Sequence, residues 1–331
     1  MAEYTIYDIA KMAGVSASTV SRVINNRSGV KKETKERITR LLKQYNYVPN
    51  ETARGLVNQS TKIIGVLIAD IRTTHHTDAI YFIERELSKH GYCCLILNTG
   101  TNEHEQTHYI QLLNQRKVDA AIFIGSIYQT QSVRKAVLTY LPATPVVLFN
   151  GYLNAPNMYG VIADEKNGVS ECVKLLAEKK RTHLAFVVDR DTPSNLLKQQ
   201  GFEAGMALCC PGEPVYIQRI METQDDAYHA TRRLMQEHPE INGIIYTEDL
   251  LAAGGIRALY DLKLPIPERV AVIGINNSRY AQNSIPLMTS LDNMLYDLSL
   301  ITVRNLMHIL QGEQVNKKIT LGTEIVVRQS T

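Results

Sequence analysis

The first 45 residues place apolar side chains at the spacing of short helices. Over residues 6–13 they recur at i, i+3, i+4 and i+7, which predicts one helix. Gly14 can adopt the positive φ that ends this helix, and Ser16 can cap a second helix over about 17–25. A third helix is predicted over about 32–45. Two helices joined by a short glycine turn, with a third closing their core, predict a helix-turn-helix, although a small helical bundle packed on the rest of the chain has the same spacing.

The second predicted helix has one apolar side and one short polar side. Val20, Val23 and Ile24 share the apolar side. At about 100° per residue, the opposite side collects small side chains and one guanidinium, which suits entry into a groove of DNA. The residues on this polar side are Ala17, Ser18, Ser21, Arg22 and Asn25.

After residue 60 the pattern changes to short apolar runs separated by amphipathic stretches. This alternation predicts parallel sheets covered by helices on both faces, and there are too many units for one sheet, so we expect two Rossmann-like lobes. The predicted strands are Ile63–Ile68, Cys93–Leu97, Ala120–Ile124, Val146–Phe149, Leu184–Val188, Gly243–Tyr246 and Val270–Ile275. The predicted helices lie near 78–90, 105–116, 131–140, 165–179, 195–208, 225–237, 250–261 and 294–311.

The composition is typical of a globular protein, and its positive charge is concentrated in the first 58 residues. The 331 residues are 44% hydrophobic and 21% charged, which excludes disordered and collagen-like classes. No run approaches 18 apolar residues, so no membrane span is predicted. Residues 1–58 contain ten Lys and Arg against five Asp and Glu, a net charge of +5. Because the whole chain has a net charge of +3, the remaining residues have a net charge of −2. A basic head on a mildly acidic body favours a polyanionic partner for the head alone.

Catalytic and metal-binding motifs are missing from the sequence. It contains no Walker loop, no G-x-S-x-G, no H-E-x-x-H and no G-x-G-x-x-G after a predicted strand. We therefore expect no enzyme, no cofactor and no metal, since the adjacent His75 and His76 would point apart on a loop. The five cysteines lack C-x-x-C spacing and the first 30 residues lack the apolar core of a secretory signal, so the expected location is the cytoplasm.

Three segments carry a resemblance to a known family. They are TIYDIAKMAGVSASTVSRVIN over residues 5–25, YVPNETARGL over 47–56 and the terminal RQST over 328–331. With them, the chain resembles the LacI/GalR family of bacterial transcriptional regulators along essentially its whole length. The resemblance implies an all-α helix-turn-helix DNA-binding domain (1–49), a hinge (50–60), and an effector-binding and dimerisation core (61–331). That core would be an α/β structure of the type I periplasmic-binding-protein kind.

The chain of this family crosses between the two lobes of the core three times. The resemblance places these crossings near residues 162, 290 and 321. It thereby implies an N-lobe of about 61–162 and 291–320, and a C-lobe of about 163–290 and 321–331.

The resemblance also assigns roles within the head. The second helix should lie in the major groove, with positions 17, 18 and 22 at base edges. Arg22 is the best base reader because its guanidinium can bridge O6 and N7 of guanine, whereas another phosphate contact is the alternative. Ala17 offers only a methyl group and Ser18 reads bases ambiguously. Lys31 replaces the Ser that would cap the third helix, so that helix should start frayed or one residue away. The implied phosphate contacts are Thr5, Tyr7, Ser16, Thr19, Ser21 and Asn25.

The hinge is the second implied DNA element. Asn50 can cap a short helix over 51–57 that contains Ala53, and Gly55 costs this helix ~1 kcal/mol relative to Ala. Such a short helix is marginal in water, so it should be coil when free and helical when two hinges meet over the minor groove. The resemblance implies that Leu56 inserts between base steps there and kinks the duplex, whereas a linker residue packed on the body is the alternative.

The expected effector site lies between the lobes. In open α/β lobes, ligands bind beyond the carboxyl ends of the strands. The segments there are Asp70–Thr77, Gly125-Ser126, Asn150, Asp189-Arg190, Thr247–Asp249 and Asn276-Asn277. From these and from the family pattern, the candidate effector-binding residues are Asp70, His75, His76, Ser126, Asn150, Lys198, Glu222, Asp249 and Asn276.

Several of these candidates depart from the family pattern. Lys198 replaces a usual Arg, Asn150 and Asn276 stand where Asp is common, His75 and His76 replace a common Phe pair, and Glu222 replaces an aromatic residue of some members. A polar or charged sugar derivative therefore fits as well as a plain hexose.

These expectations combine into a repressor of carbohydrate-utilisation genes. Its affinity for a palindromic operator would be set by a sugar or sugar derivative that changes the angle between lobes and so the placement of the two hinges. A homodimer is required because paired heads read a two-fold site. Two other classes stay open: a global catabolite-control regulator switched by a phosphoprotein on the lobe surface, and a solute receptor or sugar enzyme with an incidental basic head.

Leu56→Ala tests the implied wedge. Because the wedge acts only on a kinked, helical hinge, the variant should lose operator affinity far more than affinity for non-specific DNA. Fluorescence anisotropy with operator and scrambled duplexes measures both affinities. An equal loss on the two duplexes would count against a wedge.

Overall fold

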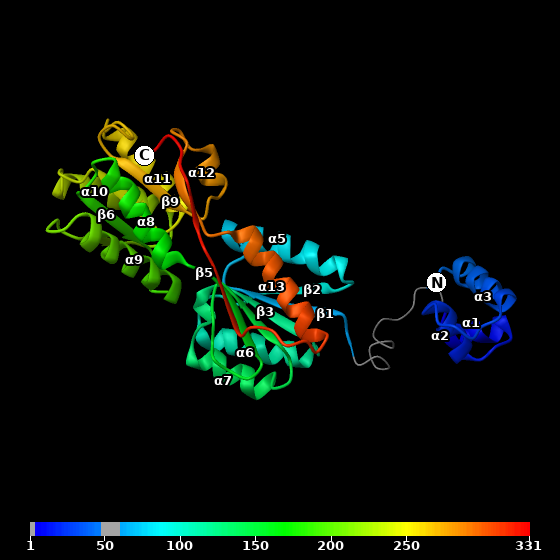
Figure 1. Ribbon diagram of the computed structural model, residues 1–331. Coiled ribbons are helices and arrows are strands. Elements are labelled where there is room, and N and C mark those ends of the chain that lie inside the picture. Colours follow the sequence, from blue (N-terminus) through cyan, green and yellow to red (C-terminus); the bar gives the residue numbers. More distant parts are fainter. Residues whose placement is uncertain (1–3, 48–59) are drawn as a thin grey trace. The chain divides into compact units, whose positions relative to one another are not determined.

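The computed structural model describes residues 4–47 and 60–331 (Figure 1). It divides into two compact units, a helical head and an α/β core that starts at Lys62. The expected fold class, a helix-turn-helix head with a two-lobed parallel α/β core, is confirmed. The hinge candidates Asn50, Ala53 and Leu56 lie outside the described residues, so their roles stay predictions.

The head holds three helices whose ends follow the predicted capping. Gly14 has φ 62°, and its N–H closes the end of the first helix. The Ser16 side chain accepts the N–H of Thr19 at the start of the second helix. Lys31 precedes the third helix without a side-chain cap, as expected for that residue. The helices are α1 (Ile6–Ala13), α2 (Ala17–Ile24) and α3 (Lys32–Gln44), and their shared core is Ile9, Ala10, Ala13, Val20, Val23 and Ile38.

The N-lobe of the core is a six-stranded parallel sheet in the order β11-β5-β4-β3-β1-β2. Val66 of the central β1 pairs with Ile96 on one side and Ile122 on the other. Helices α5 and α13 cover one face, and α6 and α7 cover the other (Figure 1). The strands are β1 (Ile63–Ile68), β2 (Cys93–Asn98), β3 (Ala120–Ile124), β4 (Val146–Phe149), β5 (Met158–Ala163) and β11 (Lys318–Leu321). The helices are α5 (Thr74–Lys89), α6 (Glu103–Gln115), the 3-10 turn η1 (Ser126–Tyr128), α7 (Gln131–Tyr140) and α13 (Leu295–Leu310).

The C-lobe repeats this plan in the order β12-β10-β9-β8-β6-β7, with β12 antiparallel to its neighbour. Helices α10 and α11 pack on one face of this sheet, and α8 and α9 pack on the other. The strands are β6 (Leu184–Val188), β7 (Tyr216–Arg219), β8 (Gly243–Tyr246), β9 (Ala271–Ile275), β10 (Thr289–Asp292) and β12 (Glu324–Val326). The helices are α8 (Glu165–Glu178), α9 (Pro193–Cys209), α10 (Gln224–Glu237), α11 (Asp249–Asp261) and α12 (Arg279–Asn283).

The chain passes between the two lobes at three places. These follow β5, which ends at Ala163, follow β10, which ends at Asp292, and lie between β11 and β12. The strands missing from the sequence pattern are β5, β7, β10, β11 and β12. Most of them are short, and β7, β11 and β12 are partly exposed at sheet edges, so they lack the continuous apolar run of a buried strand. No helix in the described part of the chain is both long and apolar enough to cross a membrane.

Helices α8 and α9 approach each other through glycine. A Cβ placed on Gly201 would lie 2.1 Å from the backbone oxygen of Lys166, and one on Gly205 would lie 2.8 Å from Cβ of Val173. Neither contact can be relieved by turning a flexible side chain. The small residues therefore set the spacing of these two helices, which carry part of the site described below.

Gly201→Ala is expected to lower the free energy of unfolding of the core by about 1–3 kcal/mol, because the added methyl group overpacks the helix pair. The matched control is Gly322→Ala, whose Cβ would have nothing within 4 Å. Thermal and urea unfolding of the two variants measure the difference. A Gly201→Ala variant as stable as the control would contradict this view of the helix contact.

Candidate functional site

The polar side of α2 is open to solvent. Arg22 and Ser18 are exposed, while Ala17 is half-buried, on the opposite side from the buried Val20 and Val23. The Arg22 guanidinium has no hydrogen bond or ion pair within the described residues, so it is available to an external acceptor. This is the chemistry that reading a guanine edge requires.

The hydroxyl groups predicted to hold phosphates also hold the helix ends. Thr5 and Asp8 form a reciprocal capping box at α1. The Ser16 hydroxyl lies 2.8 Å from that of Ser18 and 2.9 Å from that of Thr19. Asn25 donates its amide to the carbonyl of Ser21 at 2.9 Å. Tyr7 differs from these residues, since 74% of it is exposed.

The core has a polar cavity at the carboxyl ends of both sheets. One chamber of about 90 Å³ is lined from both lobes, and an adjoining chamber of about 340 Å³ shares five of its lining residues. Ligand pockets commonly hold ~300–1,000 Å³, so the larger chamber is of suitable size. The shared residues are Thr73, His75, Glu222, Glu248 and Asn276. Of the sequence candidates, the smaller chamber gathers His75, His76, Ser126, Asn150, Lys198, Glu222 and Asn276, and the larger one adds Asp70 and Asp249.

A buried carboxylate ties the two lobes together beside the smaller chamber. Glu165, only 2% exposed, accepts from the Asn150 amide at 3.3 Å and from the Ser194 hydroxyl. The Lys198 ammonium lies 3.5 Å from the same carboxylate and also donates to the Thr247 carbonyl at 3.3 Å.

A second bridge between the lobes lies next to this carboxylate. The N–H of Ser194 donates to the Ser126 hydroxyl at 3.0 Å. Two of the predicted effector contacts, Ser126 and Asn150, thus have polar groups engaged in bonds between the lobes, and a third, Lys198, is engaged with Glu165 within the C-lobe.

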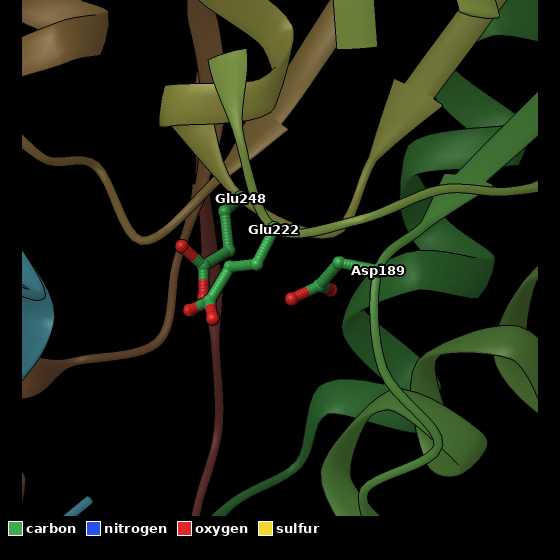
Figure 2. Close-up of side chains that lie close together, drawn as sticks. All are labelled: Asp189, Glu222 and Glu248. Atoms are coloured by element: carbon green, nitrogen blue, oxygen red, sulfur yellow. The ribbon is translucent and has the colours of Figure 1, made fainter. Parts of the chain in front are cut away.

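The wall of the C-lobe also presents three carboxylates to the cavity. Oxygens of Asp189, Glu222 and Glu248, called here the acidic cluster, lie within 4.8 Å of one another. Figure 2 shows Glu222 and Glu248 with their carboxylates together and Asp189 pointing toward them from a separate segment. Arg190 pairs with Glu222 and lies 3.7 Å from Asp189.

Glu248 is the member of the acidic cluster whose carboxylate has the fewest hydrogen-bond and ion-pair partners among the described residues. Burial and the neighbouring Asp189 raise its pKa to about 7, although Lys198 and Arg190 act in the opposite direction. Its carboxylate has no hydrogen bond or ion pair within the described residues. Asp189, by contrast, accepts from the Asn195 amide and the Thr247 hydroxyl, both at 2.9 Å.

The two adjacent histidines both line the smaller chamber. Burial lowers the pKa of His75 to about 3, and its Nδ1 is buried with no hydrogen-bond partner in the described chain. Burial also lowers the pKa of His76, whose Nδ1 lies 3.0 Å from the Asp70 carbonyl oxygen. Both rings are therefore neutral at pH 7, and each offers one donor and one acceptor nitrogen.

Asp249 and Asp70 have carboxylates that are occupied by the protein. Asp249 accepts the hydroxyl of Ser290 at 2.6 Å and the N–H of Ser278 at 2.7 Å, and it is 1% exposed. Asp70 pairs with Arg72 at 2.6 Å, and this contact holds its pKa at about 2. These contacts hold the loops that surround the larger chamber.

Other cavity residues were not singled out from the sequence. Glu165 stands in the first turn of α8, where the chain enters the C-lobe, and Ser194 and Asn195 stand in the first turn of α9. Asp189, Arg190 and Glu248 stand in the segments predicted from the strand ends, but no pattern in the sequence favours them over their neighbours. The spacing of Asn195 from Lys198, one helical turn, was the one available signal for a shared face.

Both the head and the core of this chain are similar to known proteins. Residues 5–50 match the model of bacterial regulatory proteins of the lacI family, and residues 173–331 match that of the periplasmic binding protein-like domain. An HTH-type transcriptional regulator of Lachnoclostridium phytofermentans is 32% identical over 98% of this chain and 99% of its own. The chain belongs to the LacI family. It is a DNA-binding transcriptional regulator, as other members are, and not an enzyme.

Other relatives have names that refer to sugar metabolism. The ribose operon repressor of Halalkalibacterium halodurans is 28% identical over 99% of this chain and 97% of its own. Catabolite control protein A of Priestia megaterium is 29% identical over 99% of both chains. The Lac repressor dimer, solved with operator and the anti-inducer ONPF, superposes with a TM-score of 0.91 at 20% identity, covering 99% of each chain, which shows the shared fold.

Glu248→Gln is expected to stabilise this LacI-family core at pH 8 and not at pH 5. The folded carboxyl holds its proton up to about pH 7, against 4.5 ordinarily, so the wild type loses stability as the pH rises between these values. Glutamine cannot ionise and avoids this loss, which is on the order of 1–3 kcal/mol. The melting temperatures at both pH values measure it.

The control for this prediction is Glu103→Gln, which removes an exposed carboxylate of α6. It should change the melting temperature little at either pH. A Glu248→Gln variant that is less stable than the wild type at pH 8 would contradict the account of this carboxylate.

Proposed function

We propose that the protein is a homodimeric, cytoplasmic repressor of carbohydrate-utilisation genes that reads a palindromic operator. Helix α2 enters the major groove, with Arg22, Ser18 and Ala17 toward the bases. The observation that carries this proposal is the exposed polar side of α2, on which an unpaired guanidinium stands opposite a buried core. The phosphate contacts are those named above, from Thr5 to Asn25, and the hinge residues Asn50, Ala53 and Leu56 act in the minor groove.

The effector in this proposal is a sugar or sugar derivative held between the lobes. A cavity at the carboxyl ends of two parallel sheets is where α/β folds bind ligands. Its wall is polar and carries acceptors and donors at short range, which suits a molecule with many hydroxyl groups. The name of the ribose operon repressor supports this choice of ligand class.

Coupling between the sites follows from the contacts that cross the cavity. Asn150 and Ser126 of the N-lobe bond directly to Glu165 and Ser194 of the C-lobe. A further bridge joins Arg279 of α12 to Asp78 of α5 at 3.3 Å. A ligand that lengthens or replaces these contacts changes the angle between the lobes. It acts on DNA binding to the extent that it binds one lobe arrangement more tightly than the other.

Control by a phosphoprotein is the second candidate function. Its support is the relative named catabolite control protein A. The cavity favours the small-molecule effector, because a regulator switched only at its surface has no use for buried, partly unpaired polar groups between its lobes. A partner that changes operator affinity without any small molecule would reverse this preference.

Arg22→Ala is expected to abolish specific operator binding, with a loss of about 1–3 kcal/mol per head for the bidentate guanine contact. The matched control is Arg40→Ala, which removes the same charge from an exposed position of α3. Gel-shift titrations on operator and on scrambled duplex over a range of salt separate base reading from phosphate contact. Retained sequence preference in Arg22→Ala would refute the assignment of the reader.

A further inference from the structure

The charges that line the effector cavity do not balance. Lys198 is held by Glu165, so this pair is neutral, and Arg190 is the remaining cation beside the three carboxylates of the acidic cluster. The two histidines of the wall are neutral at pH 7 because burial lowers the pKa of both. With every carboxylate ionised, the wall of the smaller chamber carries two negative charges more than positive ones, and Asp249 adds one more in the larger chamber, where Asp70 and Arg72 balance each other.

The acidic cluster lies where a ligand has to pass. Glu222 and Glu248 belong to the walls of both chambers, so a molecule that extends from one chamber into the other contacts them. Asp189 faces the same point from the smaller chamber (Figure 2). The excess charge is therefore placed on the path of the effector and not on the outer surface.

A second, independent feature of the wall is a buried imidazole nitrogen that has no partner within the described residues. The Nδ1 of His75 is buried and unpaired within the described residues, and His75 lines both chambers next to the cluster. Buried polar atoms in proteins are nearly always hydrogen-bonded, so such an atom at a cavity wall indicates a missing partner. The neutral ring can exchange a hydrogen bond with a hydroxyl or amine of a bound molecule.

From these features, and resting on the proposed effector role of the cavity, we propose that the effector carries a protonated amine, as an amino sugar does, held by Glu248 and Glu222. An ammonium group supplies three hydrogen-bond donors and a positive charge. It therefore suits a cluster of carboxylates that has too few donor groups and cations of the protein around it. A phosphorylated sugar would add negative charge to the cluster. A neutral sugar would leave the carboxylate of Glu248 without a counter-charge.

A divalent cation is the other source of positive charge for three carboxylates. The guanidinium of Arg190 already pairs with Glu222 and lies near Asp189, so it would repel an ion placed between these two residues. The organic ammonium needs only the side of the cluster around Glu248, where no cation is paired. The experiment below separates the two.

The test is isothermal titration calorimetry of the full-length protein with D-glucosamine, D-galactosamine and D-mannosamine, each against its parent hexose. At least one amino sugar should bind about tenfold or more tightly than its hexose, the strength of a charge-assisted hydrogen bond. Glu248→Gln should remove most of this preference, whereas Glu103→Gln should keep it. Because the comparison of ligands on the wild type is itself decisive, the test does not depend on the variant folding.

Three results would overturn the inference. They are binding in which every hexose equals its amine, no binding by any of the three amines, and a calcium chloride titration whose binding is lost in Glu248→Gln, which would make the cluster a metal site. In the first case, a hexose that also changes operator affinity leaves the proposed function standing. Operator affinity that no sugar of the panel changes would count against the proposed function instead.

Discussion

The core of this protein depends on one buried carboxylate. Glu165 stands at the first turn of α8, just after the chain leaves the N-lobe, and it draws together Asn150 of one lobe with Ser194 and Lys198 of the other. A carboxylate buried to this degree is tolerated only when charge and hydrogen bonds satisfy it. The lobes are therefore held at one arrangement by polar contacts beside the cavity, and not by a broad apolar interface there.

This arrangement explains how a small molecule can have a large effect. The contacts across the cavity are few and polar, so a ligand with several hydroxyl or amine groups can exchange with them at modest cost. The sheets on either side are rigid, because their central strands are buried on both faces. Movement is thus confined to the three crossings. The N-lobe sheet, whose strand β1 begins just after Lys62, is continuous in sequence with the segment that leads to the head.

The fold was accessible from sequence because its signals are local. Apolar runs define the central strands, and Gly14 and Ser16 mark the helix ends of the head through backbone requirements that few other residues meet. The direction of side chains at strand ends is not local. Glu248 has its carboxylate in the acidic cluster, while its neighbour Asp249 accepts from Ser290 of β10 and from Ser278 at the start of α12. Both partners of Asp249 are distant from it in the sequence. Lys198 likewise meets Glu165 through a packing of α8 on α9 that spacing alone does not reveal.

The central claim is that the cavity and the operator site are thermodynamically linked, and closing a linkage cycle tests it most directly. Operator affinity is measured by anisotropy with and without a saturating sugar that binds the core, and sugar affinity is measured by calorimetry with and without operator. The account predicts that the two ratios are equal and differ from one, since coupling is reciprocal. A sugar that occupies the cavity while both ratios equal one would contradict it.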